Sequence, residues 1–394
     1  MKRLLAIILA VSLAGCSAAE TPDKTVQNTT DKNINLTTVC PYVSGEIISG
    51  PGGWYEEMHH TDGTTDILFT DISTGVRSLL SEETILTTPY GCVTGIFFSD
   101  GYLYRYSDGY PVSMKKDSNI SSLYQFSAEG KLLNKTEYPQ EIKSTPYSAV
   151  VSDGENLYFA GNNVTYNGTD ATSLSPCIYS VNQQDLSIKE IFRPDAYSIK
   201  LIGGYKNNLI VNISRKDNNN TFIRTVELLD LTDFSSEKLF ESRYDWHMLN
   251  EAKLVNHMDT KGTLKIYDLE SRKTEAVTLF DKEDHLNSWV IPAANIYDSR
   301  IFIRTSQYEG NYEKSYVYDY TDNKLTEVIH YYGLPYVSSR NGEKYCLIPQ
   351  RFIRVFFNNG LTERADYRYV LSSYEDYIDS VENITDITNE IDYR

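Results

Sequence analysis

The chain consists of short stretches in which hydrophobic and polar residues alternate, separated by turns rich in Gly, Asn, Asp and Ser. Alternation with a period of two is typical of β-strands that bury one face, and many of these stretches are β-branched or aromatic. The stretch from Asp153 to Phe159 shows the pattern well, because an Asp-Gly turn leads directly into Leu-Tyr-Phe. The pattern predicts an all-β protein.

Three markers recur in step along the chain. An aromatic residue at the head of a strand returns at intervals of 43 to 57 residues. A turn with an apolar strand follows it, as at Asp153 to Phe159, and then a third strand such as Ile178 to Val181. The seven strand-head residues are Tyr42, Tyr90, Tyr147, Tyr197, Trp246, Trp289 and Tyr336.

Each repeat holds about four short strands in roughly 50 residues, which is typical of a β-propeller blade. A blade cannot bury both faces alone and must stack on its neighbours in a ring. Large tyrosine rings suit the wedge between blades, with their hydroxyls left wet at the rims. The repeats predict seven four-stranded blades, with six or eight as alternatives. Two segments compete as the outer strand of the last blade, residues 34–39 and residues 381–387.

The best-formed repeat, Asp153 to Phe159 followed by Ile178 to Val181, carries the blade signature of a known group. In this signature the chain resembles bacterial exported propeller lipoproteins with TolB-like or low-density-lipoprotein-receptor-like blades. The resemblance covers residues 41 to about 387. It implies the fold and carries no catalytic signature, and the YWTD motif of the receptor propellers is absent.

The first residues have the pattern of a secretion signal. Lys2 and Arg3 precede an apolar run from Leu4 to Leu13, which is too short to span a bilayer. The run ends in Leu-Ala-Gly-Cys, which resembles a bacterial lipobox with Cys16 as its cysteine. The resemblance implies that Cys16 becomes a lipidated N-terminus, with fatty acids such as palmitate that anchor the protein to the lipid bilayer.

Three domains follow: a signal at residues 1–16, a flexible polar tether at 17–38 and the propeller at 39–394. We expect the protein on the extracytoplasmic side of a bacterial cell membrane or outer membrane. The chain carries 37 Lys and Arg against 54 Asp and Glu, so its net charge is −17. Such a body repels phosphate groups, and we expect no nucleic-acid partner. An exported protein can form disulfides, and the pairing stays open for four cysteines. These are Cys40, Cys92, Cys177 and Cys346.

The sequence contains no nucleophile elbow, P-loop, zinc-protease motif or EF-hand loop. The only histidine cluster is His59-His60, and neighbours on a strand point to opposite faces. We expect no metal site and no cofactor. A glycosidase needs an acid and a base that flank one bond. Four residues after the strand heads, only Glu46 is acidic. We therefore expect that the protein is not an enzyme.

Several loops between second and third strands are long, and they should emerge on the same face as the strand heads. Aromatic residues on that face are candidates for ligand binding, although the strand heads could instead serve only as wedges between blades. The candidates are Tyr110, Tyr166, Tyr308, Tyr312, Phe356, Trp246 and Trp289. We expect a non-catalytic binding or scaffold module for an envelope protein or glycan. The alternative is a glycan-acting envelope hydrolase or lyase with its site at the channel mouth.

Overall fold

The computed structural model describes most of the chain from residue 35 onwards, and all of the described residues lie in one compact unit, Ile34–Arg394. The described residues are 35–41, 47–59, 64–80, 85–86, 94–107, 121–145, 148–168, 170–256, 262–280, 288–290, 296–306, 314–328, 334–356 and 363–387. Cys16 and Cys92 lie outside them, as do residues 42–46 at the head of the first repeat. Within the described part, no helix has the length and apolar character needed to cross a membrane.

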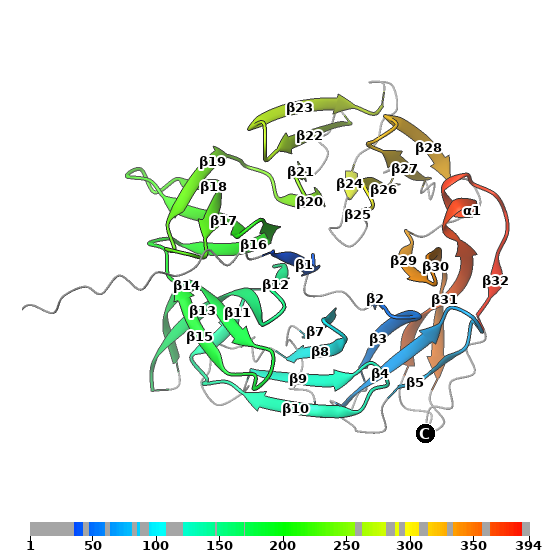
Figure 1. The fold of residues 1–394 in the computed structure, drawn as a ribbon, viewed down its shortest axis with the longest axis horizontal. Coiled ribbons are helices and arrows are strands. Elements are labelled where there is room, and N and C mark those ends of the chain that lie inside the picture. The colour runs from blue at the N-terminus through cyan, green and yellow to red at the C-terminus, as the bar shows by residue number, and fades with distance from the viewer. Residues whose placement is uncertain are drawn as a thin grey trace, which may run out of the picture. The chain divides into compact units, whose positions relative to one another are not determined.

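Seven antiparallel sheets follow one another around a ring, so the predicted seven-bladed propeller is confirmed (Figure 1). Blade 1 contains β2 (Ile47–Gly50), β3 (Gly53–His59), β4 (Thr64–Asp71), β5 (Arg77–Leu79) and β6 (Ile85–Leu86). Blade 2 contains β7 (Thr94–Ser99), β8 (Tyr102–Ser107), β9 (Ser122–Ser127) and β10 (Leu132–Glu137). Blade 3 contains β1 (Thr37–Cys40), β11 (Ile142–Ser144), β12 (Val150–Ser152), β13 (Asn156–Asn167), β14 (Asp170–Asn182) and β15 (Ile188–Phe192).

The remaining four blades contain all the strands after Phe192. They are β16 (Ser198–Tyr205), β17 (Asn208–Lys216), β18 (Phe222–Asp230) and β19 (Ser236–Glu241) in blade 4; β20 (Trp246–Asn250), β21 (Lys253–Asn256), β22 (Thr263–Asp268) and β23 (Lys273–Thr278) in blade 5; β24 (Ser288–Val290), β25 (Ile296–Tyr297), β26 (Arg300–Ser306), β27 (Lys314–Asp319) and β28 (Lys324–Val328) in blade 6; and β29 (Tyr336–Arg340), β30 (Glu343–Phe356), β31 (Glu363–Ser373), the short helix α1 (Tyr374–Ile378) and β32 (Thr385–Asp386) in blade 7.

The strand-head residues mark the innermost strands, as the repeats predict. β20 begins at Trp246, β29 begins at Tyr336, and β16 begins one residue after Tyr197. Because successive strands alternate in direction, the strand heads and the connections between second and third strands share one face, which we call the groove face. The tight turns after the innermost strands, such as Asp100-Gly101, lie on the opposite face, which we call the turn face. Both residues of that turn have positive φ (50° and 88°), as a two-residue hairpin turn requires.

The blades are held together by side chains that pack between neighbouring sheets. In the boundary between blades 4 and 5, Leu228, Trp246 and Tyr267 belong to one buried cluster. Not every tyrosine hydroxyl stays wet at the rim, contrary to expectation. The buried hydroxyl of Tyr104 in blade 2 donates to Gln183 Oε1 in blade 3 at 2.8 Å and accepts from Gln125 Nε2 at 2.9 Å. Burial raises the pKa of Tyr104 to about 12, so this hydroxyl stays protonated.

The N-terminal strand shows that one of the two segments predicted as the outer strand of the last blade was assigned wrongly. β1 does not join the last blade; it pairs with β12, the innermost strand of blade 3, with Thr37 opposite Ser152. The backbone N–H of Leu36 donates to Lys206 O at 3.1 Å, which places Leu36 at the turn face. Residues 35–38, predicted to be tether, therefore belong to the propeller, and the chain passes from the turn face to the groove face inside the ring (Figure 1).

Close packing fixes β1 against blade 4. The N–H of Gly204 donates to Thr38 Oγ1 at 3.1 Å. A Cβ atom at Gly204 would lie 2.6 Å from Leu36 Cβ, so only glycine allows this approach. β1 thus lies along the inner side of blades 3 and 4.

The last blade completes itself with β32, so the alternative at residues 381–387 is confirmed. No described strand is shared between blades 1 and 7, and side chains close the ring. Trp54 Nε1 donates to Tyr336 O at 2.9 Å, and the Ser338 hydroxyl lies 3.1 Å from Gly50 O and 3.0 Å from Gly53 O. The apolar cluster beneath them contains Ile47, Trp54, Ile72, Leu347, Tyr369, Leu371 and Ile387.

A buried ion pair lies in the same boundary. Arg77 of β5 pairs with Glu56 of β3, and both side chains are almost fully buried. The Arg77 guanidinium also lies over the ring of Tyr369 in blade 7, at 5.4 Å from its centroid. A guanidinium over an aromatic face is attracted to it, so one cation links the two ends of the ring.

We predict that the contact between blades 1 and 7 depends on the indole N–H of Trp54. Trp54→Phe keeps most of the buried ring and removes the hydrogen bond to Tyr336. We expect a loss of about 1–2 kcal/mol in the free energy of unfolding, measured by urea denaturation. An unchanged unfolding midpoint would show that the ring does not depend on this bond.

Candidate functional site

The best-defined surface site surrounds the segment Glu241–Trp246, which joins the outer strand of blade 4 to the innermost strand of blade 5 on the groove face. The Ser242 hydroxyl holds this segment. It donates to Tyr244 O at 3.1 Å, and it accepts from the Tyr244 N–H at 3.1 Å and from Trp246 Nε1 at 2.7 Å. The Ser242 N–H donates to Arg224 O at 3.0 Å. These bonds fix the indole of Trp246 and the backbone at Tyr244.

An open groove of about 490 Å³ lies between blades 4 and 5 along this segment. Its aromatic residues are Phe240, Tyr244 and Trp246. The rings of Phe240 and Trp246 meet edge to face with 4.9 Å between centroids, and Trp246 is only 6% exposed. Tyr244 is 46% exposed. The volume falls in the range of small-molecule sites, and the aromatic faces suit a sugar ring or another flat, amphipathic group.

Both signs of charge line this groove. Its carboxylates are Glu241, which pairs with Lys238 at 2.5 Å, and Glu275, which accepts a hydrogen bond from the Tyr320 hydroxyl at 2.6 Å. Its cations are Arg243 and Lys265, and neither forms an ion pair within the described part of the chain. Carboxylates of this kind can act as general acid or base, and the cations can bind an anionic group.

A second open groove, also of about 490 Å³, abuts the first and shares Glu241, Ser242 and Arg243 with it. Its other wall is the start of β18, where Phe222, Ile223 and Arg224 are all exposed. The two grooves therefore lie side by side on either side of one short segment.

The β17–β18 hairpin that forms this wall is fixed from within the blade. Glu227, which is buried, pairs with Arg215 and accepts from the Ser236 hydroxyl at 2.6 Å and the Thr225 hydroxyl. Burial opposes ionisation of Glu227, but the bonds from Arg215, Ser236 and Thr225 outweigh it and hold its pKa below the ordinary value. The carboxylate is thus charged in the folded protein at neutral pH.

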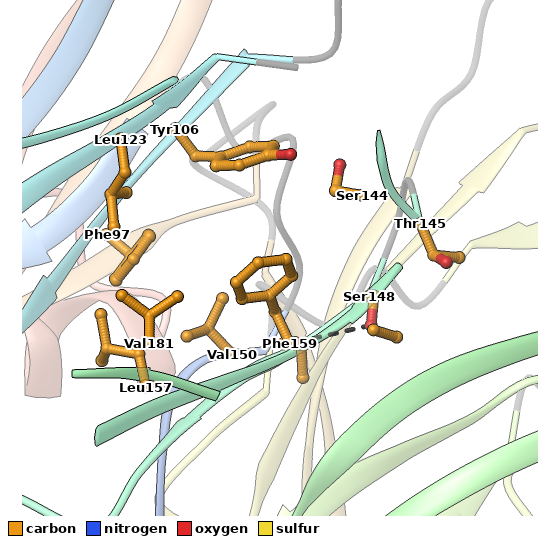
Figure 2. Close-up of a pocket in the computed structure, with 12 residues that line it drawn as sticks. Phe97, Tyr106, Leu123, Ser144, Thr145, Ser148, Val150, Leu157, Phe159 and Val181 are labelled. Carbon is orange, nitrogen blue, oxygen red and sulfur yellow. Dashed lines mark hydrogen bonds between the residues drawn. The ribbon is translucent and has the colours of Figure 1, made fainter. Parts of the chain in front are cut away.

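A third hollow lies between blades 2 and 3 and is far smaller. Its volume is about 30 Å³, enough for a water molecule and too small for a substrate. Figure 2 shows Phe97, Leu157 and Phe159 on one side of it, and the hydroxyls of Ser144 and Thr145 on another. The buried Thr145 Oγ1 has no hydrogen-bond partner in the described part of the protein, so this hollow suits one bound water.

Of the sequence-predicted ligand residues, the structure describes the side chains of Trp246 and Tyr166, and these two lie in different blades. Trp246 lines the groove between blades 4 and 5. Tyr166 is half-buried in blade 3, where its hydroxyl donates to Gln140 O at 3.3 Å, and the loop predicted around it is a long paired hairpin of β13 and β14. Trp289 and Phe356 lie in β24 and β30, but their side chains lie outside the described part of the structure. Tyr110, Tyr308 and Tyr312 lie outside the described residues.

Pattern analysis misses most of the groove. The Tyr-Asp-Trp run before β20 is a usable signal for Tyr244, because an aromatic pair follows a polar linker. Glu275 and Lys265 carry no such signal. They lie in different strands of blade 5, and only the pairing of β22 with β23 brings these two strands together beside the groove.

The described cysteines and acidic residues do not assemble a metal centre. Cys177 and Cys346 are buried free thiols, and burial raises the pKa of Cys177 to about 11. Within the described residues, no group of three or more His, Cys, Asp or Glu side chains could hold a metal ion. Only one of the six histidines, His247, lies there with its side chain described.

The sequence matches no protein-family model. It matches no curated protein either. Solved structures share the fold. The propeller domain of the Trilobed protease from Pyrococcus furiosus is 11% identical with a TM-score of 0.50, over 90% of this chain and 98% of that one. An oligogalacturonate lyase solved in complex with manganese is 12% identical with a TM-score of 0.52, over 87% of this chain and 92% of that one.

The acylaminoacyl peptidase of Pyrococcus horikoshii is 10% identical with a TM-score of 0.50, over 88% of this chain and 52% of the peptidase. This chain therefore spans about half the length of that peptidase. At such identities the likeness shows the fold alone. Even so, these structures overturn the expectation of a non-catalytic binding or scaffold module, because each is an enzyme or the propeller domain of one.

The Glu227 cluster predicts how stability depends on pH. The pKa of Glu227 is lowered in the folded state. The stabilisation that its ionised carboxylate provides is therefore present above the ordinary pKa of 4.5 and is lost as the pH falls below that value. Glu227→Gln should weaken the native protein at neutral pH and flatten the decline of its melting temperature below pH 4.5. A variant whose melting temperature falls with acid as steeply as that of the native protein would contradict this assignment.

Proposed function

We propose that the protein is an enzyme that cleaves a glycan, a hydrolase or lyase, with its site in the groove between blades 4 and 5. One observation carries the proposal. Glu241 and Glu275 belong to the lining of the same groove as Phe240, Tyr244 and Trp246.

The chemistry of glycan cleavage supports this assignment. Hydrolysis needs one carboxyl group as acid and another as base or nucleophile, and elimination needs a base for the proton next to a uronate carboxylate. Tyr244 offers an exposed ring on which a sugar can lie. Lys265 and Arg243 offer positive charge for a carboxylate on that sugar or for charge that develops during cleavage.

The comparisons support the substrate class. The oligogalacturonate lyase is matched over 92% of its length, whereas the acylaminoacyl peptidase is matched over only about half of its length. The fold of the chain thus corresponds to nearly the whole of the lyase. The lyase was solved with manganese, but the described residues of this chain contain no group of side chains that could hold such an ion.

The location follows from the N-terminal segment. We propose that the protein is a bacterial lipoprotein of the TolB-like kind, anchored through Cys16 on the extracytoplasmic side. Leu36 lies at the turn face, where its N–H donates to Lys206 O. A flexible tether would let the propeller reach glycans of the envelope.

The proposal predicts a loss of activity in two carboxylate variants. The full chain is incubated with acidic and neutral oligosaccharides, with new reducing ends as the readout and ultraviolet absorbance of an unsaturated product as the mark of a lyase. Glu275→Gln and Glu241→Gln should each lower kcat by about 10²-fold or more, because each removes a group that transfers a proton.

Glu343→Gln is the matched control. Glu343 accepts from the Tyr345 hydroxyl at 2.6 Å in blade 7, so this variant loses a similar bond outside the groove and should keep full activity. Full activity in both groove variants, or no cleavage of any glycan by the native protein, would refute the proposal.

A further inference from the structure

An exposed aromatic pair lies on blade 4, and one of its members, Phe222, lines the second groove. Tyr197 is 63% exposed and Phe222 is 50% exposed, and their rings meet edge to face with 4.8 Å between centroids. Water exposure of two large rings in contact is unfavourable unless a ligand covers them. Both lie on the groove face, Tyr197 before β16 and Phe222 at the start of β18.

The pair is held rigidly. The Tyr197 N–H donates to Ser214 O at 2.7 Å, and Phe222 is paired with Lys216 at the last rung of the β17–β18 ladder. Asp217 closes the turn beyond that rung, where its carboxylate accepts the N–H of Asn219 at 2.8 Å. A surface fixed before binding loses little conformational freedom when a ligand arrives.

Positively charged side chains lie near the two rings. Lys216 Nζ lies 5.6 Å from the ring centroid of Tyr197 and 5.1 Å from that of Phe222. Arg243 has no ion-pair partner within the described part of the chain, and Arg224 has only a long pair of 3.6 Å with Asp245. Three cations therefore flank the rings and the adjoining groove.

We propose that this surface, defined by Tyr197, Lys216, Phe222, Arg224 and Arg243 and called here the blade 4 platform, binds uronate sugars. The inference rests on the proposed function and names its substrate as an acidic glycan. The rings would carry the apolar faces of the sugars, and the cations would bind their carboxylates. Because the second groove shares Glu241–Arg243 with the first, a chain bound on the platform continues into the groove where cleavage is proposed.

The net charge of −17 does not prevent this binding. Repulsion from distant carboxylates is screened beyond about 8 Å at physiological ionic strength, whereas the platform cations act at contact distance. Binding to the platform should therefore weaken as salt is raised, since exposed charges carry part of it.

The test measures binding separately from cleavage. Dissociation constants are measured by calorimetry for the full chain with oligogalacturonate, its methyl-esterified form and neutral dextran, in the Glu275→Gln background so that the ligand stays intact. Tyr197→Ala combined with Phe222→Ala should weaken oligogalacturonate binding about tenfold, and Arg243→Gln should do so by a similar factor. Phe234→Ala is the control, because Phe234 is an exposed ring at the opposite end of the same blade.

Each result supports or overturns the proposed binding of uronate sugars to the platform. Binding of oligogalacturonate that is lost in the platform variants and kept in Phe234→Ala supports the platform. Equal binding of the methyl-esterified form overturns the uronate assignment, and unchanged binding in the double variant overturns the platform. Binding that depends on the platform, in a protein that cleaves nothing, would leave the platform standing while the proposed catalytic function fails.

Discussion

The structure depends on the burial of each blade between two others. A four-stranded sheet with apolar side chains on both faces is stable only when both faces are covered, so no blade is secure until the ring is closed. Within the described part of the chain, blades 1 and 7 share no strand. Closure rests on the apolar cluster around Trp54 and Leu347, on the Trp54–Tyr336 hydrogen bond and on the Arg77 guanidinium over Tyr369. Side-chain contacts therefore join blade 1 to blade 7.

The closed ring also determines where chemistry can occur. β1 lies inside the ring against blades 3 and 4, and the two open grooves lie along the segment that joins blade 4 to blade 5. Between blades 4 and 5 the connecting segment bends around Ser242, and the sheets leave an open groove on the groove face. The same serine bonds hold the indole of Trp246 and the backbone of Tyr244 beside Glu241.

The repeat pattern was sufficient to predict the fold. Strand heads such as Trp246 and Tyr336 recur because every blade needs a wedge at the start of its innermost strand, and this requirement is local in sequence. The course of β1 could not be predicted, because its partner β12 is selected by a long-range contact that Gly204 permits. The groove could not be predicted for the same reason, since its lining residues come from two blades that pack side by side. Trp246 could be predicted because it is a strand-head residue that packs between blades 4 and 5 and also lines the groove.

The most direct measurement is hydroxyl-radical footprinting of the full chain with and without saturating oligogalacturonate, read by mass spectrometry at each aromatic residue. If the glycan lies across blades 4 and 5, Tyr197, Phe222 and Tyr244 should become protected, while Phe234 and Tyr102, exposed elsewhere, should react as before. Protection confined to other blades, or no protection at saturation, would contradict the account.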